Sequence, residues 1–515
     1  MAERHGAMTS LTTMRAPATL ALAFLGLALA AGFLPVFWLG ATQGFARFDS
    51  YLLRVLIFTL LQAGLSTLIS VMIGLPVARA LARQQFPGRR LVIRLLNLPL
   101  ALPSIVVIIG VIEVYGTRGW LGGLFNIYGL QGILLAHVFF NAPLAARLLL
   151  SEFERIPAES WKLSAQLGFS SAHNWQRIEW PQIRGGLPGI ALLIFLLCAS
   201  SFAVVLTLGG GPRATTLEVA IYQALRADFD PARAAALAIV QLLLCVSLAL
   251  IAQAWGGVMQ GWPALRMGAR RFDGQDAPSR AADYAIIALG LLLLLPPLAA
   301  LTVSGIVSLN LSPAFFRSLA TSVVLGASSA ALAFLIVWPL AQRAVRSGAW
   351  RRVSGLSVLA AWIIPPAVIA TGWFILLIAR ADMTGLAPAL VIVMNGMMSL
   401  PFVYQTLTPA LAREAEAHDR LCANLGIGGW TRFRLIDLPA LKRPIGLALV
   451  MAFILSLGDL TAISLFGTQD LVTLPALIYR QLGTYRVNEA VGTALLLALL
   501  VLAFTTLAER WSAKA

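Results

Sequence analysis

The segment GLPVARALARQQFPGRR (residues 74–90) recurs in the second half of the chain as VWPLAQRAVRSGAWRR (residues 337–352). Outward from these two segments, residues 51–255 align with residues 314–507 at a near-constant offset. A repeat of this length indicates that one structural unit has been duplicated within the chain. We therefore expect two tandem halves that share one fold.

The 515-residue chain is strongly apolar, since 59% of its residues are hydrophobic and only 12% are charged. Soluble domains carry about 25% charged residues, so a soluble multidomain enzyme is excluded. Several apolar runs exceed the roughly 18 residues that mark a candidate membrane-spanning helix. We predict about twelve spans, with ends uncertain by about two to four residues. They cover residues 18–40, 52–80, 92–114, 129–150, 187–208, 234–256, 284–308, 318–341, 353–379, 386–408, 445–467 and 489–508.

The expected fold is an all-α membrane protein with two similar halves in tandem. Six predicted spans separate equivalent points of the repeat, so both halves have the same orientation in the membrane. Such a parallel repeat is related by an axis along the membrane normal. We expect residues 1–50 to form a cytoplasmic tail and the first span, residues 51–256 the first half, residues 257–283 a cytoplasmic linker and residues 284–515 the second half.

The formal net charge of +16 comes from 38 Lys and Arg residues against 22 Asp and Glu residues. With the N-terminus inside, most of the basic residues fall in the connections on the inner side. Enrichment of cytoplasmic loops in Lys and Arg is the general rule for membrane proteins. We therefore predict that both termini are cytoplasmic, and the excess charge requires no nucleic acid partner.

Two long connections on the inner side, residues 151–186 and 409–443, share one pattern. Each contains a candidate amphipathic helix that stops at a glycine, in residues 157–168 and 414–426, and a glycine just past the end is typical helix punctuation. After each glycine and nine intervening residues come an isoleucine, any residue, an apolar residue and a proline. The apolar side of each helix must pack either against the protein's own helix ends or against a cytoplasmic partner.

This G-x9-I-x-[apolar]-P pattern resembles the EAA loop of ABC importer permeases. Residues 51–508 as a whole resemble two such permease halves fused, of the type I importer kind. The similarity is closest to the permeases of thiamine ABC transporters, which are neighbours of the ferric-iron permeases. It is carried by LTLGGGPRATTLEVAIYQALRADFDPARAA from residue 206, LCANLGIGGWTRFRLIDLPALKRP (421–444), SLGDL (456–460) and TLPALIYRQLGTYR (473–486).

The resemblance implies that each loop forms a coupling helix that seats in a cleft of an ATP-binding subunit. It implies as partners two copies of that cytoplasmic subunit, a periplasmic solute-binding protein and the lipid bilayer of a bacterial inner membrane. Lys162 and Arg420 stand where the family has an acidic residue six positions before the glycine. The implied docking positions are Ala165, Gly168, Ile178 and Pro181 in the first loop and Ala423, Gly426, Ile436 and Pro439 in the second.

The chain carries no GxxxxGK[ST] sequence, the phosphate-binding loop of many ATPases. ATP hydrolysis is therefore expected on a partner subunit, and we predict no catalytic residues. The three cysteines and four histidines are scattered along the chain, so the sequence predicts neither a metal centre nor a cofactor.

Ionisable and polar side chains inside membrane spans are candidates for a substrate pathway. The alternatives are that an acid lies at a span end in water or caps a broken helix, and that the polar residues join neighbouring helices. The candidates are Glu113, Asn141, Ser200, Ser201, Asn395 and Asp459.

The sequence thus predicts a permease that moves thiamine, and as further candidates its phosphate esters, inward by alternating access. Ferric iron or another small solute is the alternative cargo within the same class. A secondary transporter driven by an ion gradient is a different class, which would require charged relays within the spans. It would also leave the two long loops unexplained.

Overall fold

A computed structural model describes residues 15–43, 49–123, 127–209, 211–254, 271–377 and 383–513. Helices are the only regular secondary structure in this part, with no strand in the described residues. The first residues of the predicted tail and residues 255–270, which include much of the predicted linker, lie outside the described residues. The helix that follows begins at Ala277, within the predicted linker.

The elements of the two halves follow one another in the same order. The first series is α2 (Arg15–Thr42), α3 (Ser50–Arg83), α4 (Arg89–Ala101), α5 (Ser104–Tyr115), α6 (Leu130–Glu154), α7 (Ala158–Gln166), α8 (Ser171–Asn174), η2 (Trp175–Glu179), α9 (Trp180–Ala199), α10 (Ala203–Leu208), η3 (Pro212–Ala214), α11 (Leu217–Arg226) and α12 (Pro231–Ala254). The second series is α13 (Ala277–Val307), α14 (Pro313–Arg346), α15 (Gly348–Ile363), α16 (Pro366–Leu377), α17 (Met383–Asn424), α18 (Gly429–Arg432), η4 (Phe433–Asp437), α19 (Leu438–Leu457), α20 (Thr461–Phe466), α21 (Leu474–Gly483) and α22 (Val487–Ala513).

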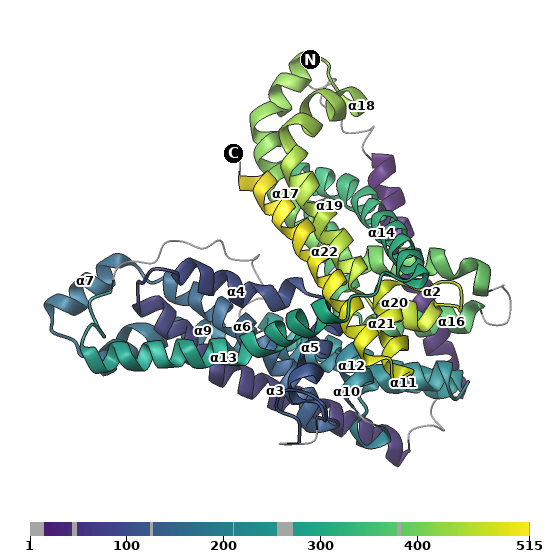
Figure 1. Cartoon of the computed structure of the whole chain (residues 1–515). Helices are drawn as coiled ribbons and strands as arrows, with labels where there is room; N and C mark the ends of the chain where they lie inside the picture. Colours follow the sequence, from purple (N-terminus) through teal and green to yellow (C-terminus); the bar gives the residue numbers. More distant parts are fainter. Residues whose placement is uncertain are drawn as a thin grey trace.

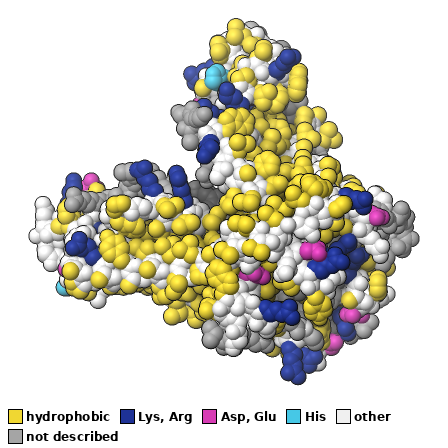
Figure 2. Space-filling view, viewed as in Figure 1, with side chains coloured by type: hydrophobic (Ala, Val, Ile, Leu, Met, Phe, Trp, Pro, Cys, Tyr) yellow, Lys and Arg dark blue, Asp and Glu magenta, His cyan; other side chains and the backbone are white. Residues whose placement is uncertain are grey.

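The helices form two arms that diverge from a common junction (Figure 1). One arm contains α4, α6, α9 and α13, and the other contains α14, α17, α19 and α22. Hydrophobic side chains cover long stretches of both arms, and the surface is hollowed between them (Figure 2). Ten described helices are long and apolar enough to cross a membrane, and two bent pairs bring the number to as many as twelve. The prediction of an all-α membrane protein with about twelve spans is confirmed.

Two predicted spans, 92–114 and 353–379, are sharply bent. Helices α4 and α5 meet at 109°, and α15 and α16 meet at 82°. The backbone is extended at Leu102 and Ile364, each of which precedes a proline. A residue before proline is pushed out of the helical region, and proline has no amide hydrogen to continue the helix. The two halves therefore bend at equivalent places for the same reason.

The first helix of each series packs against the other half. Helix α2 contacts α14 and α16, whereas α13 contacts α3 and α5. In both contacts the backbones approach closely at a glycine. Where α16 meets α2, a Cβ added at Gly372 would lie 1.7 Å from the carbonyl oxygen of Gly32. Where α5 meets α13, a Cβ added at Gly110 would lie 2.6 Å from the carbonyl oxygen of Pro297. Small residues allow such approach between membrane helices. These contacts tie the two halves together.

We expect Gly372→Ala to destabilise the chain by about 1–3 kcal/mol, the usual cost of overpacking a close contact. The added methyl group would force α16 away from α2, because the atom it meets is backbone. Thermal unfolding in detergent measures the effect. The matched control is Gly355→Ala in α15, where an added Cβ meets nothing within 4 Å. Equal unfolding temperatures for the two variants would contradict the proposed contact.

Candidate functional site

The two long loops fold into matching structures, which we call the first knob (residues 157–181) and the second knob (residues 415–439). Gly168 and Gly426 adopt left-handed backbone angles, with φ of +65° and +64°. The amide of each glycine donates a hydrogen bond to the carbonyl three residues earlier. The amide of the following residue, Phe169 or Ile427, donates to the carbonyl five residues earlier, at 3.0 Å and 2.9 Å respectively. This pair of hydrogen bonds is typical of a helix that ends at a glycine. The two glycine stops are therefore where the sequence predicts them.

The helices before these glycines differ in one respect. In the first knob α7 is separate from α6, because Pro157 interrupts the chain between them. The repeat places Ala415 at the equivalent position, and α17 runs without a break through it to Asn424. The second candidate helix is thus the last part of a 42-residue helix.

The knobs lie at the ends of the two arms, with α7 at one tip and α18 at the other (Figure 1). Charged side chains are frequent at both tips (Figure 2). Large apolar side chains are nevertheless exposed on both knobs, and these include Leu163, Leu167, Leu421, Leu425 and Trp430. Of the predicted docking residues, Ala165, Gly168, Pro181, Ala423, Gly426 and Pro439 are exposed, and Ile178 and Ile436 are half-buried. Trp161 of the first helix is buried.

Each knob is built around a buried acid that the sequence pattern did not single out. Glu179 and Asp437 occupy the variable position between the isoleucine and the apolar residue, and neither is exposed to solvent. Both end a one-turn π-helix, η2 or η4. A buried carboxylate requires a partner. The presence of an acid at this position in both halves is the sequence feature from which the two buried acids could have been predicted.

Different arginines neutralise the two acids. Glu179 pairs with Arg79 of α3 at 2.7 Å and with Arg271, which also lies over the Trp161 ring at 3.9 Å. Arg271 belongs to the chain that joins the two halves, so this connection is anchored in the first knob. Although burial opposes ionisation of Asp273, its hydrogen bonds from Arg271 hold the pKa of that carboxyl below its ordinary value.

In the second knob the neutralising residue is Arg432 of α18, within the knob itself. Its guanidinium reaches Asp437 at 3.1 Å, Glu414 at 3.1 Å and Asp419 at 2.6 Å. Gln342 of α14 donates a further hydrogen bond to Asp437 at 3.0 Å. One arginine thus serves three acids.

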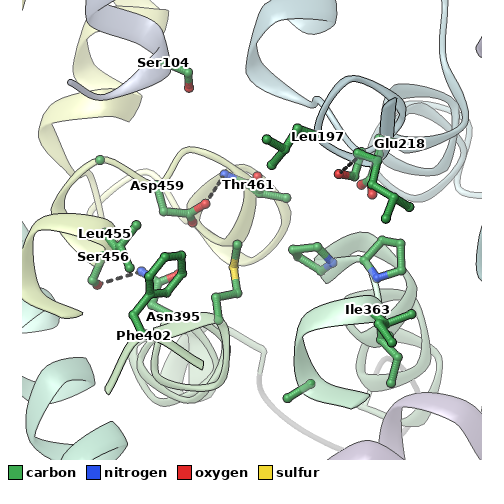
Figure 3. A pocket seen from close by; sticks show the side chains of 18 of the residues that line it. Ser104, Leu197, Glu218, Ile363, Asn395, Phe402, Leu455, Ser456, Asp459 and Thr461 are labelled. Carbon is green, nitrogen blue, oxygen red and sulfur yellow. Dashed lines mark hydrogen bonds between the residues drawn. The ribbon is translucent and has the colours of Figure 1, made fainter. Parts of the chain in front are cut away.

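A cavity of about 390 Å³ lies at the junction of the arms. It is lined from both halves, at the α4–α5 and α15–α16 bends and beside the breaks after α9 and α19. Figure 3 shows the side chains that surround it, with Asp459 and Glu218 on different walls. Gly- or Pro-interrupted apolar segments at corresponding positions of two repeats are the usual location of a transporter's binding site. The cavity is therefore the candidate substrate site.

Three of the six predicted pathway residues line this cavity: Ser200, Asn395 and Asp459. Asp459 also caps α20, accepting hydrogen bonds from the amides of Thr461 at 3.1 Å and Ala462 at 2.8 Å. Asn395 donates to the Ser456 hydroxyl at 2.9 Å, while its own carbonyl oxygen has no hydrogen-bond partner.

The other three predicted residues are not among those that line the cavity. Asn141 joins α6 to α9 through the Cys198 sulfur at 3.3 Å. Glu113 is partly exposed near the end of α5, and Ser201 lies in the break between α9 and α10. The cavity adds Glu218, at the start of α11. Sequence reasoning missed it because it falls in a connection between predicted spans.

No group of three or more His, Cys, Asp or Glu residues suited to a metal ion occurs within the described residues. The three cysteines are free and buried. The arrangement is therefore two similar exposed knobs, a junction of broken helices and a central cavity. These features define a multi-pass membrane permease.

Comparisons with known proteins agree with this class. Residues 324–513 match the family described as "Binding-protein-dependent transport system inner membrane component". The chain is 44% identical to the thiamine transport system permease protein ThiP of Brucella abortus, over 98% of this chain and 97% of the relative. It is 41% identical to ThiP of Escherichia coli over 93% of both chains, and 36% identical to ThiP of Haemophilus influenzae over 88% and 87%. The chain belongs to the family of thiamine transport system permeases, which are ABC importer components of the inner membrane.

Proposed function

We propose that this chain carries thiamine inward across a bacterial inner membrane as the permease subunit of an ABC importer. In this proposal, two copies of a cytoplasmic ATP-binding subunit dock on the two knobs, and both chain termini lie on the same side as the knobs. A periplasmic solute-binding protein delivers the cargo to the opposite face. The names of the similar permeases support the choice of cargo.

The observation that carries the proposal is the charge of the cavity. Glu218 and Asp459 are its only charged lining residues among those described, and no Lys, Arg or His is among them. In a chain with a formal charge of +16, this acidic lining favours a small cationic guest, because a cleft with one sign of charge concentrates ligands of the opposite sign. Thiamine carries a fixed positive thiazolium ring. A volume of about 390 Å³ lies within the usual range of small-molecule sites, about 300–1,000 Å³.

The arrangement of the arms supports alternating access as the mechanism. Closure of two ATP-binding subunits would draw the knobs at the two tips together, and each arm would rotate about the junction. Rigid-body rotation of this kind is a common way to switch between two states. The cavity lies at the junction, so its access would change from one face of the membrane to the other while the cargo stays in place.

Uptake of labelled thiamine into proteoliposomes tests the proposal. We expect uptake only when the permease, the ATP-binding subunit and the binding protein are all present with ATP. Omission of any one component should reduce uptake to the level of empty liposomes. Uptake by this chain alone, without ATP, would overturn the proposal and favour a secondary transporter. Robust uptake of chelated ferric iron but not of thiamine would replace the cargo while leaving the class intact.

A further inference from the structure

Glu218 is a buried acid without a partner. It lies in the first turn of α11, its side chain has 0% exposure, and neither carboxylate oxygen has a hydrogen-bond partner. The repeat places Pro475 of α21 at the corresponding position, so the acid belongs to one half only. An unpaired carboxylate in apolar surroundings is costly unless an opposite charge is supplied or the group takes up a proton. The question is what supplies it.

No described residue of the lining supplies that charge at the cavity. Glu218 faces a lining that is otherwise mainly apolar, with no cationic side chain among the described lining residues. The Ser200 hydroxyl, another polar group of the lining, donates its hydrogen to the carbonyl of Leu196 at 2.7 Å. The position of Glu218 at the start of α11 offers a helix dipole, which contributes only about 0.3–1 kcal/mol. This is less than the cost of an isolated buried charge.

Asp459, the second acid of the cavity, is in a different situation. Its two oxygens accept backbone hydrogen bonds at 3.1 Å and 2.8 Å, which hold it as the cap of α20. Among the described lining residues, the buried side-chain acceptors left without a partner are both Glu218 oxygens and the carbonyl oxygen of Asn395. Unpartnered acceptors, among them one uncompensated carboxylate, are therefore buried in the wall of the cavity (Figure 3).

We propose that Glu218 is the charge-selecting residue of the permease cavity and that the site takes an organic monocation in preference to a phosphorylated, anionic form of the same molecule. This inference rests on the proposed function and sharpens it, because it assigns cargo selection to the permease as well as to the binding protein. Asp459 has a positioning role, since it holds the start of α20 against the cavity. Phosphate esters would place negative charge beside two acids and no base.

Uptake by the complete importer in proteoliposomes tests this assignment. We expect Glu218→Gln to reduce thiamine uptake about tenfold, the effect of removing one nearby charge at low effective dielectric. Uptake of thiamine monophosphate should fall less or rise, so that the ratio of thiamine uptake to thiamine monophosphate uptake decreases. Glu218→Asp, which keeps the charge, should retain most of the wild-type ratio. A Glu218→Gln variant with the wild-type ratio would overturn the inference, as would an equal loss for both cargoes, which indicates a structural role.

A second measurement does not depend on thiamine. Ser104 lines the cavity at the α4–α5 bend, and Ser104→Cys can be placed in a chain whose three native cysteines are changed to alanine. We expect a trimethylammonium methanethiosulfonate to label this thiol faster than its sulfonate counterpart. Glu218→Gln should lower the ratio of the two labelling rates about tenfold. Gln481→Glu is the control for a charge change elsewhere, because Gln481 is outside the cavity lining. An unchanged ratio in Glu218→Gln would exclude charge selection. If the ratio falls but wild-type permease takes up no thiamine, the inference holds and the proposed cargo is wrong.

Discussion

A permease with Gly426→Arg is expected to insert into the membrane normally and to lose ATP-driven transport. Gly426 has a φ of +64° and ends the helix of the second knob. An L-residue strains this left-handed backbone, and a long cationic side chain would project from the exposed face that we propose docks the ATP-binding subunit. Loss of a central docking contact costs about 2 kcal/mol or more, which weakens the complex about thirtyfold. Gly168→Arg should have the same effect in the first knob.

ATPase stimulation and uptake in the reconstituted importer measure this effect. Gly426→Asn should retain much of the activity, because asparagine tolerates left-handed angles. Gly348→Arg adds the same charge at an exposed glycine with nothing within 4 Å of the added Cβ, and it should leave coupling near the wild-type level. Wild-type ATPase stimulation in Gly426→Arg, together with normal uptake, would show that this glycine does not contribute to docking.

The repeat and the helix-stop glycines were predictable because they depend on local rules. A glycine after an amphipathic segment stops a helix wherever it occurs, and Gly168 and Gly426 do so in the same way. Helix α7 separates from α6 because Pro157 intervenes, and the absence of a proline at Ala415 explains the continuous α17. The sequence contains both features, but only a residue-by-residue comparison of the two halves reveals the difference.

The candidate site was less predictable because its residues come from distant parts of the chain. Asp459 could be selected as an acid in an apolar run, whereas Glu218 lies outside the predicted spans and enters the cavity only through the packing of α11. The partners of the knob acids show the same limit. Glu179 and Asp437 are equivalent by repeat, yet Arg271 of the linker neutralises one and Arg432 of the knob neutralises the other. Long-range pairing of this kind does not follow from spacing.

The asymmetry between the two knobs leads to the second large effect. We expect Arg432→Gln to destabilise the second knob by about 3–5 kcal/mol, the usual cost of removing one partner from a buried ion pair. The variant leaves Glu414 and Asp437 buried without their guanidinium, and both side chains are at most 2% exposed. Arg271→Gln should cost less, because Arg79 still contacts Glu179 at 2.7 Å.

Limited proteolysis of the knobs and thermal unfolding in detergent distinguish these variants. Arg432→Gln should increase cleavage within residues 415–439 and reduce coupled ATPase activity, because a loosened knob cannot transmit motion to its arm. Arg432→Lys keeps the charge but loses the planar fork that serves several carboxylates at once, so its loss should be intermediate. Adding Asp437→Asn to Arg432→Gln should recover part of the stability, since it removes one uncompensated charge. The contrary outcome is additivity, in which Asp437→Asn lowers the free energy of unfolding by the same amount in the Arg432→Gln background as in the wild-type chain. The two residues would then act independently, and the ionic cluster would not hold the knob together.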